Sequence, residues 1–177
     1  MMTMFLLMLA GSAAAQEQEL TKAEKKALQE RIDSLQYAEA VQALNDRAFT
    51  LEADQVLFKY GQMAYVNSNT NFVSVKDNHA VVQVAFNIPV SGPNGLGGVT
   101  VEGTFTEYDL KKDKKGNISL SFNAMGTGIS ARVDITLYKG GNNATVYITP
   151  NFNSNRMTLN GVIVPLQKSS VFKGRSI

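Results

Sequence analysis

The sequence predicts a mainly β protein, an antiparallel meander of about eight strands that closes as a barrel or folds into a two-layer sandwich. One amphipathic helix is expected before the strands. Two observations predict this fold: apolar and polar residues alternate along most of the chain after Phe49, and turn-forming residues separate the alternating runs. With 177 residues, 44% of them hydrophobic, the chain can bury one core, and we expect a single antiparallel β-domain over residues 48–177.

Residues 1–15 are typical of a cleavable signal peptide. An apolar run, Met4–Ala10, precedes Ala13, Ala14 and Ala15, which are small residues of the kind that signal peptidase accepts. The run is shorter than the roughly 20 apolar residues that span a bilayer, so we expect no integral membrane segment after cleavage. A buried N-terminal strand is the alternative, since the Lys or Arg usual at the start of a signal peptide is missing.

Cysteine content and net charge limit the possible locations and partners of the protein. The sequence has no cysteine, which excludes disulfides, thiolate metal sites, a Cys nucleophile and a lipid-modified N-terminal Cys. The expected location is therefore the periplasm or the medium, without a lipid anchor. Seventeen Lys and Arg against fifteen Asp and Glu give a net charge of +2, too small to attract nucleic acid to the molecule as a whole.

Residues 16–47 are expected to form the N-terminal helix. They are rich in Glu, Lys, Gln, Ala and Leu and contain no Gly or Pro. Thr21 and Glu24 have the spacing of a capping box, so the helix should begin near Lys22. An apolar stripe with spacings of three and four is expected to lie along the β-domain, although whether the helix packs on its own domain stays open. The stripe consists of Leu28, Ile32, Leu35, Ala38, Val41 and Leu44.

Alternation with a period of two predicts strands with one buried and one solvated face. The clearest runs are 99–106, 118–124 and 129–137, in which aliphatic or aromatic residues alternate with Ser, Thr, Asn, Arg and acidic residues. Parallel strands, which are buried on both faces, are instead continuously apolar. No helical segment long enough for a parallel crossover follows Phe49, so the pairing is expected to be antiparallel. Barrel and sandwich remain equally compatible with this pattern.

Four segments of the β-region resemble an exported bacterial family known as domain of unknown function 4251. They are TNFVSV at 70–75, AVVQVAF at 80–86, GPNGLGGVTVEG at 92–103 and MTLNGVIVPL at 157–166. The resemblance covers most of the chain after the first 15 residues. It implies export and an origin in Bacteroidetes, and it implies no activity, because none is attached to the family.

Two groups of residues are candidates for ligand binding. The first is a glycine-rich loop between two strands, in which the backbone can approach another group closely: Gly92, Asn94, Gly95, Gly97 and Gly98. A wide turn or bulge is the alternative explanation, because a strand rather than a helix follows the glycines. The second is the aromatic pair Tyr60 and Tyr65, which lie near Phe58 and could line a cavity mouth or plug the core.

Residues suited to catalysis or metal binding do not form a recognisable pattern. The only histidine, His79, lies in an expected hairpin turn, and no serine lies in a nucleophile-elbow sequence. We therefore assign no catalytic residue, no metal ligand and no cofactor. Carboxylates at 102, 107, 109 and 134 could meet across strands as in a glycosidase, although pairing with neighbouring charges is the favoured explanation. The lysines at 111, 112, 114 and 115 are expected to form a solvated turn.

These observations favour a non-catalytic envelope protein. The expected partner is a small molecule, a glycan or a protein, bound through the loops or the interior of the β-domain. One alternative is a hydrolase that uses paired carboxylates. A second is an interaction module that pairs with another chain through an exposed edge strand. The sequence leaves the oligomeric state open.

Overall fold

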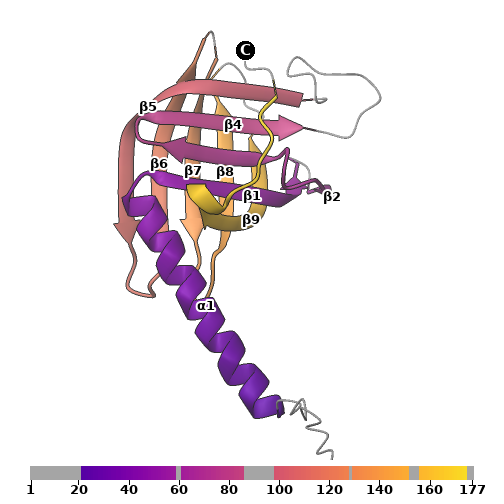
Figure 1. Cartoon of the computed structure of the whole chain (residues 1–177). Helices are drawn as coiled ribbons and strands as arrows, with labels where there is room; N and C mark the ends of the chain where they lie inside the picture. The colour runs from indigo at the N-terminus through magenta and orange to yellow at the C-terminus, as the bar shows by residue number, and fades with distance from the viewer. Residues whose placement is uncertain (1–20, 59–60, 86–97, 128, 152–155, 175–177) are drawn as a thin grey trace, which may run out of the picture.

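The computed structural model describes residues 21–58, 61–85, 98–127, 129–151 and 156–174, and contains one long helix and nine strands in this part of the chain (Figure 1). The helix is α1, Lys22–Asn45. The strands are β1, Ala48–Leu57; β2, Met63–Tyr65; β3, Phe72–Lys76; β4, His79–Ala85; β5, Gly98–Lys112; β6, Ile118–Gly126; β7, Ser130–Leu137; β8, Asn143–Pro150; and β9, Met157–Pro165. A short 3₁₀ helix, η1, Leu166–Lys168, follows β9.

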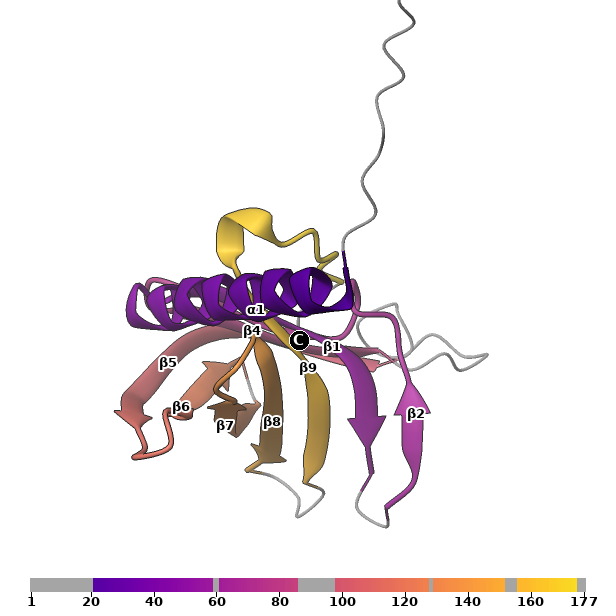
Figure 2. The same cartoon turned by 90° about the horizontal axis from the view of Figure 1, so that it is seen from below.

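The predicted antiparallel meander is confirmed, and it closes as a barrel. The strand order is β2-β1-β3-β4-β5-β6-β7-β8-β9, and β1 also pairs with β9. This last pairing runs from Phe49 opposite Pro165 to Leu57 opposite Thr158, with a bulge at Asp54. Eight strands therefore form a closed ring. The short strand β2 lies outside the ring, beside the C-terminal half of β1 (Figure 2).

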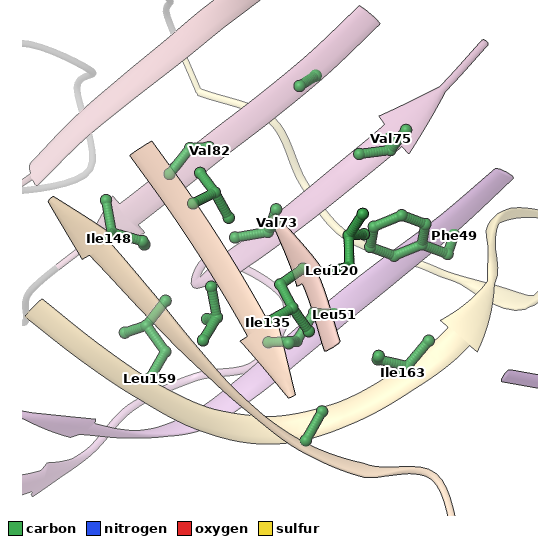
Figure 3. Close-up of a cluster of buried hydrophobic side chains, with 14 of the residues drawn as sticks. Phe49, Leu51, Val73, Val75, Val82, Leu120, Ile135, Ile148, Leu159 and Ile163 are labelled. Carbon is green, nitrogen blue, oxygen red and sulfur yellow. The ribbon is translucent and has the colours of Figure 1, made fainter. Parts of the chain in front are cut away.

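Inward-facing side chains fill the barrel as the alternation predicts. Along β7, for example, Ala131, Val133, Ile135 and Leu137 are buried, and the residues between them are exposed or partly exposed. Side chains from β1, β3, β4, β6, β7, β8 and β9 meet in one apolar cluster (Figure 3). Burial of each large aliphatic or aromatic side chain stabilises the fold by roughly 1.5–3 kcal/mol, so this cluster is the main source of stability.

Helix α1 begins where the sequence predicts. The Thr21 hydroxyl accepts a hydrogen bond from the Glu24 N–H at 3.3 Å, and the Glu24 carboxylate accepts one from the Thr21 N–H at 2.8 Å. This is the capping box expected from their spacing, and it is confirmed. The carboxylate also lies near the positive end of the helix dipole.

The expectation that one apolar stripe of α1 lies along the β-domain is wrong. Leu28, Ile32 and Leu35 are 49%, 37% and 59% exposed, whereas Leu44 is completely buried. Leu35 and Leu44 are nine residues apart, which is about two and a half helical turns, so repeated steps of three place them on opposite sides of the helix. Only the last two turns or so pack on the barrel, and the N-terminal half projects beyond it (Figure 1).

Residues 166–174, the C-terminal strap, run across the outer surface of β1, β3, β4 and β5 (Figure 1). Ser169 bonds to Glu52, and Lys173 pairs with Glu102 at 2.7 Å. Beneath the strap lies the buried amide of Gln83, which accepts from Gly174 N–H at 2.7 Å and donates to Phe172 C=O at 2.8 Å. The strap therefore covers part of the polar outer face of the barrel.

Candidate functional site

Only two of the seven ligand-binding candidates lie in the described part of the chain. These are Gly98, the first residue of β5, and Tyr65, the last residue of β2. Five candidates lie outside the described residues, namely Tyr60, Gly92, Asn94, Gly95 and Gly97. The side chain of Tyr65 is 77% exposed on the outer surface, so it does not plug the core.

The position of Gly98 has a structural explanation that needs no ligand. Gly98 lies opposite Ala85 in the β4–β5 pair and is buried. A Cβ at this position would lie 1.8 Å from the carbonyl oxygen of Val84, which is an impossible contact. Because any larger residue would push the two strands apart, close strand packing alone requires glycine here.

The barrel interior is occupied by its own side chains. Phe49, Phe122 and a set of buried Leu, Ile and Val residues fill the space between the described strands. The aromatic side chains of Phe105 and Tyr108 pack on Phe122, with ring centroids 5.4 and 6.2 Å from its own. A ligand is therefore better accommodated on the surface than inside.

The outer face of β8, β9, β1 and β2 combines aromatic and polar side chains, and we call it the tyrosine face. These four strands lie side by side (Figure 2). The face holds three of the six tyrosines of the chain, Tyr65, Tyr138 and Tyr147. Its polar members are Asp54, Gln55, Asn143, Thr145, Arg156, Thr158 and Asn160. It lies beyond the part of the barrel that the strap crosses.

Strand register arranges these side chains in rows. One row crosses the four strands as Tyr147, Thr158, Leu57 and Met63, which occupy paired positions. The next row is Thr145, Asn160, Gln55 and Tyr65. Because side chains two apart on a strand share a face, neighbouring rows form one continuous surface. The first row is mainly apolar and the second mainly polar.

Contacts within the face hold several of its side chains in place. The Tyr138 hydroxyl donates to Thr145 Oγ1 at 3.3 Å, and Thr145 Oγ1 donates to Asn160 Oδ1 at 2.8 Å. The guanidinium of Arg156 lies 4.1 Å from the ring centre of Tyr147, a cation–π contact that restrains both side chains. These contacts restrain the side chains of the face relative to one another.

Two shallow hollows lie on the tyrosine face, each of about 290 Å³. Asp54, Gln55, Tyr138 and Asn160 line one hollow, together with residues of β8 and β9. The other lies between Tyr147, Arg156 and the β1–β2 hairpin. Each is close to the lower limit of the volumes usual for small-molecule sites, roughly 300 Å³. Together they suit an extended ligand.

Hydrogen-bonding groups remain available in the hollows. In the described part of the chain, no hydrogen bond engages the side chains of Asp54 or Gln55, and the Asn160 amide uses only its oxygen. The carboxylate of Asp54 can accept hydrogen bonds, and the two amides can both donate and accept. The surface can thus form several hydrogen bonds to a polyhydroxylated ligand beside aromatic rings.

The four carboxylates considered for hydrolysis bind separate partners. The pairs are Glu102 with Lys173, Glu107 with Asn123, Asp109 with Lys111, and Asp134 with Ser121 and Arg132. His79 is exposed at the start of β4, as expected for a hairpin residue. Among the described residues, no three His, Asp or Glu side chains are grouped to hold a metal ion. These contacts do not favour a hydrolase.

Sequence reasoning missed most of the tyrosine face. Tyr138 directly follows β7, and Tyr147 is an ordinary outward position of β8. Residues 138 and 55 are far apart in the chain. The β1–β9 closure brings them together, and no local pattern predicts which strands close a barrel. The outward position of Tyr147 in an alternating run was the one available signal.

Comparisons with known proteins identify the family. The family model for a domain of unknown function, DUF4251, matches residues 31–163. This chain is similar to a DUF4251 family protein from Bacteroides eggerthii DSM 20697 whose crystal structure is known, with 54% sequence identity. The match covers 84% of this chain and 99% of that chain, and the TM-score is 0.72. Among curated proteins, none matches. No described helix is both long enough and apolar enough to cross a membrane. The chain belongs to the DUF4251 family.

Proposed function

We propose that this protein is an exported, non-catalytic glycan-binding protein that holds its ligand on the tyrosine face. The observation that carries the proposal is the arrangement of Tyr65, Tyr138 and Tyr147 beside unengaged amide and carboxylate groups on one sheet surface. The expected location is the periplasm or the medium, supported by the apolar run and alanines of residues 1–15.

A sugar ring matches this surface chemically. Each ring has an apolar face of C–H groups and a rim of hydroxyl groups, so it packs on an aromatic ring while its rim forms hydrogen bonds. The row with Tyr147 and Leu57 supplies apolar contact, and the row with Asn160 and Gln55 supplies donors and acceptors. Neighbouring rows are two residues apart along each strand, which is about 6.5 Å, so an extended chain of sugars can contact both.

A glycan fits better than a protein partner. The apolar patch on the described part of the face consists of Leu57, Phe58 and Met63, and the adjoining row of Thr145, Asn160 and Gln55 is polar. Stable protein interfaces usually bury an apolar core inside a polar rim. One shallow hollow is lined by amide, hydroxyl and phenol groups, and the other by Leu57, Phe58, Tyr147, Arg156 and Thr158. Polar and apolar linings side by side favour a glycan, which presents both kinds of surface.

Binding of neutral oligosaccharides tests the proposal. The full chain is titrated against a panel of uncharged oligosaccharides by isothermal titration calorimetry, and each sugar that binds is tested with Tyr147→Ala and Tyr138→Ala. We expect each variant to weaken binding at least about tenfold, since loss of an aromatic contact in a binding site costs more than about 1 kcal/mol. Leu35→Ala, which removes an exposed side chain on the projecting part of α1, is the matched control and should bind normally.

Two results would contradict the proposal. Equal affinity of the tyrosine variants and the wild type would show that any sugar binds elsewhere. Absence of binding across the panel, together with binding of unrelated peptides that depends on Tyr147, would assign the face to a protein partner. Export is tested separately, by N-terminal sequencing of the protein from its producing cell, which should begin at Gln16.

A further inference from the structure

A further hollow of about 270 Å³ lies at the end of the barrel near α1, and lysines line most of it. Its walls come from three parts of the chain: Tyr37 in α1, the β5–β6 turn at 112–116, and Lys139 in the β7–β8 turn. The charged residues that line it are Lys112, Asp113, Lys114, Lys115 and Lys139. Only the turn lysines were evident in the sequence. The fold adds Lys139 and Tyr37.

The charge of this lysine pocket is not neutralised by the protein. Four lysines and one aspartate give the lining a net charge of +3, which exceeds the +2 of the whole sequence. In the described part of the chain, no ion pair engages any of the four lysines. The rest of the sequence therefore has a net charge of −1, and the pocket is a local excess of positive charge.

The only acidic residue of the pocket already has hydrogen-bond partners. The Asp113 carboxylate accepts hydrogen bonds from the N–H groups of Lys115 and Asn117 and from the Asn117 amide, each at 2.8 Å. These bonds stabilise the charged form and lower the pKa of Asp113, the Asn117 side chain contributing most. The carboxylate thus shapes the turn instead of pairing with a lysine.

Contacts between the three segments hold the pocket in shape. The Tyr37 hydroxyl donates a hydrogen bond to the Gly116 carbonyl, and the Lys139 N–H donates to Asn117 Oδ1 at 3.1 Å. Gly116 has a φ of +92°, and a Cβ there would lie 3.0 Å from Cδ of Lys139. The stem of Lys139 therefore packs over the glycine, which limits the directions in which its ammonium group can point.

We infer that the lysine pocket binds an anionic polysaccharide. Four ammonium groups spread over two turns exceed what a single monovalent anion neutralises, so the matching ligand carries several charges. A nucleic acid needs a longer basic surface than one pocket on an otherwise slightly negative protein. The inference does not rest on the tyrosine face, because the hollows there share no lining residue with the pocket.

A membrane surface fits this region less well. A bilayer would need both the lysines and an apolar side chain to face the same way. The exposed apolar residues of α1 are Leu28, Ile32 and Leu35. Tyr37 and Leu28 are nine residues apart, about two and a half turns, so the apolar residues point away from the side of α1 that carries the pocket. One flat surface cannot contact both.

Binding to dextran sulfate tests the inference, with neutral dextran as the uncharged comparison. In calorimetric titrations of the full chain at low salt, the double variant Lys112→Gln/Lys139→Gln should bind dextran sulfate at least about tenfold more weakly, because charge-assisted hydrogen bonds are lost. The control Lys22→Gln/Lys25→Gln removes the same charge from the projecting part of α1, where neither lysine pairs with a carboxylate of the described residues, and should change the Kd less than about twofold. Unchanged circular dichroism melting will show that the variants fold.

The outcomes separate the possible explanations. A selective loss in the pocket variant supports the inference. Equal losses in both variants would overturn it, because net charge alone would then govern binding. Failure of the wild type to bind dextran sulfate would also overturn it. So would pocket-dependent binding to phosphatidylglycerol vesicles without binding to dextran sulfate, which would assign the lysines to a membrane surface.

Discussion

The hydroxyl of Tyr108 donates a hydrogen bond to the backbone carbonyl of Leu44 at 2.5 Å, and this bond joins β5 to the last turn of α1. The guanidinium of Arg47 lies over the same ring, 4.9 Å from its centre. Both contacts occur where the chain passes from the helix into β1. The junction therefore depends on one partly buried phenol.

Removal of the Tyr108 hydroxyl should weaken this junction. We expect Tyr108→Phe to lower the free energy of unfolding by about 0.5–1.5 kcal/mol, because one partly buried hydrogen bond is lost while the ring remains. Urea denaturation followed by circular dichroism measures the change. Tyr138→Phe is the matched control: its hydroxyl forms a longer bond at the surface, so a loss as large as that of Tyr108→Phe would contradict the account.

Alkaline pH should destabilise the protein through the same residue. Burial raises the pKa of Tyr108, and Arg47 only partly opposes this shift. A folded-state pKa above the ordinary value of about 10 means that the unfolded chain loses its proton first. Stability is therefore complete below about pH 10 and falls as the pH rises through the folded-state pKa.

The loss at high pH should be below about 1.4 kcal/mol per pH unit, the limit for one group, because the Tyr108 side chain is still partly exposed. Unfolding free energies of the wild type and Tyr108→Phe, measured between about pH 9 and 11, test this. The difference between the two proteins should shrink as the pH rises. A constant difference would contradict the assigned pKa direction.

The C-terminal strap should depend on Gln83. Its amide donates hydrogen bonds to Thr70 C=O and Phe172 C=O and accepts hydrogen bonds from Thr100 and Gly174. All four bonds are between 2.7 and 3.0 Å long. We expect Gln83→Ala to lower the free energy of unfolding by about 2–4 kcal/mol, because several buried polar groups lose their partner. Trypsin should also cleave faster after Lys173, which mass spectrometry detects.

Gln36→Ala is the control for the strap. Because Gln36 is exposed on α1, its replacement should change the free energy of unfolding by less than about 0.5 kcal/mol. Equal cleavage of the wild type and Gln83→Ala after Lys173 would mean that the strap is held by other contacts.

Two leucines of α1 should respond differently to truncation. Leu44→Ala should cost about 2–5 kcal/mol, because it leaves a cavity beneath the helix. Leu28→Ala, on the projecting half, should change the free energy of unfolding by no more than about 0.5 kcal/mol. Chemical denaturation of both variants measures this, and similar losses would mean that the whole stripe packs on the barrel.

Local sequence patterns predicted the helix and the strands, but they could not predict contacts between segments that are far apart in the chain. Alternation along residues 129–137 predicted β7 because each strand has one dry and one wet face. The strap was missed because Gln83 has the polar character of a solvated outward position, yet it is completely buried by residues about ninety positions later. The prediction that one stripe of α1 packs on the β-domain was wrong for a geometric reason. Successive steps of three residues fall short of a full helical turn, so the stripe winds around the helix.

The candidate site was less predictable than the fold. Tyr65 was identified from its sequence neighbours, whereas Tyr147 reaches the same surface only because β8 pairs with β9 and β9 with β1. The glycine loop attracted attention through its composition, but the close approach of Gly98 to Val84 accounts for the described glycine by packing alone. Composition thus indicated the glycine-rich loop as the candidate site, whereas strand register indicates the tyrosine face.

Chemical-shift mapping with a bound neutral oligosaccharide tests the central claim most directly. In ¹H–¹⁵N spectra of the full chain, the account predicts the largest shifts at Gln55, Tyr147 and Asn160, on three neighbouring strands. Shifts concentrated at Ala85 and Gly98, which flank the glycine-rich loop, would contradict it and place the ligand at that loop instead.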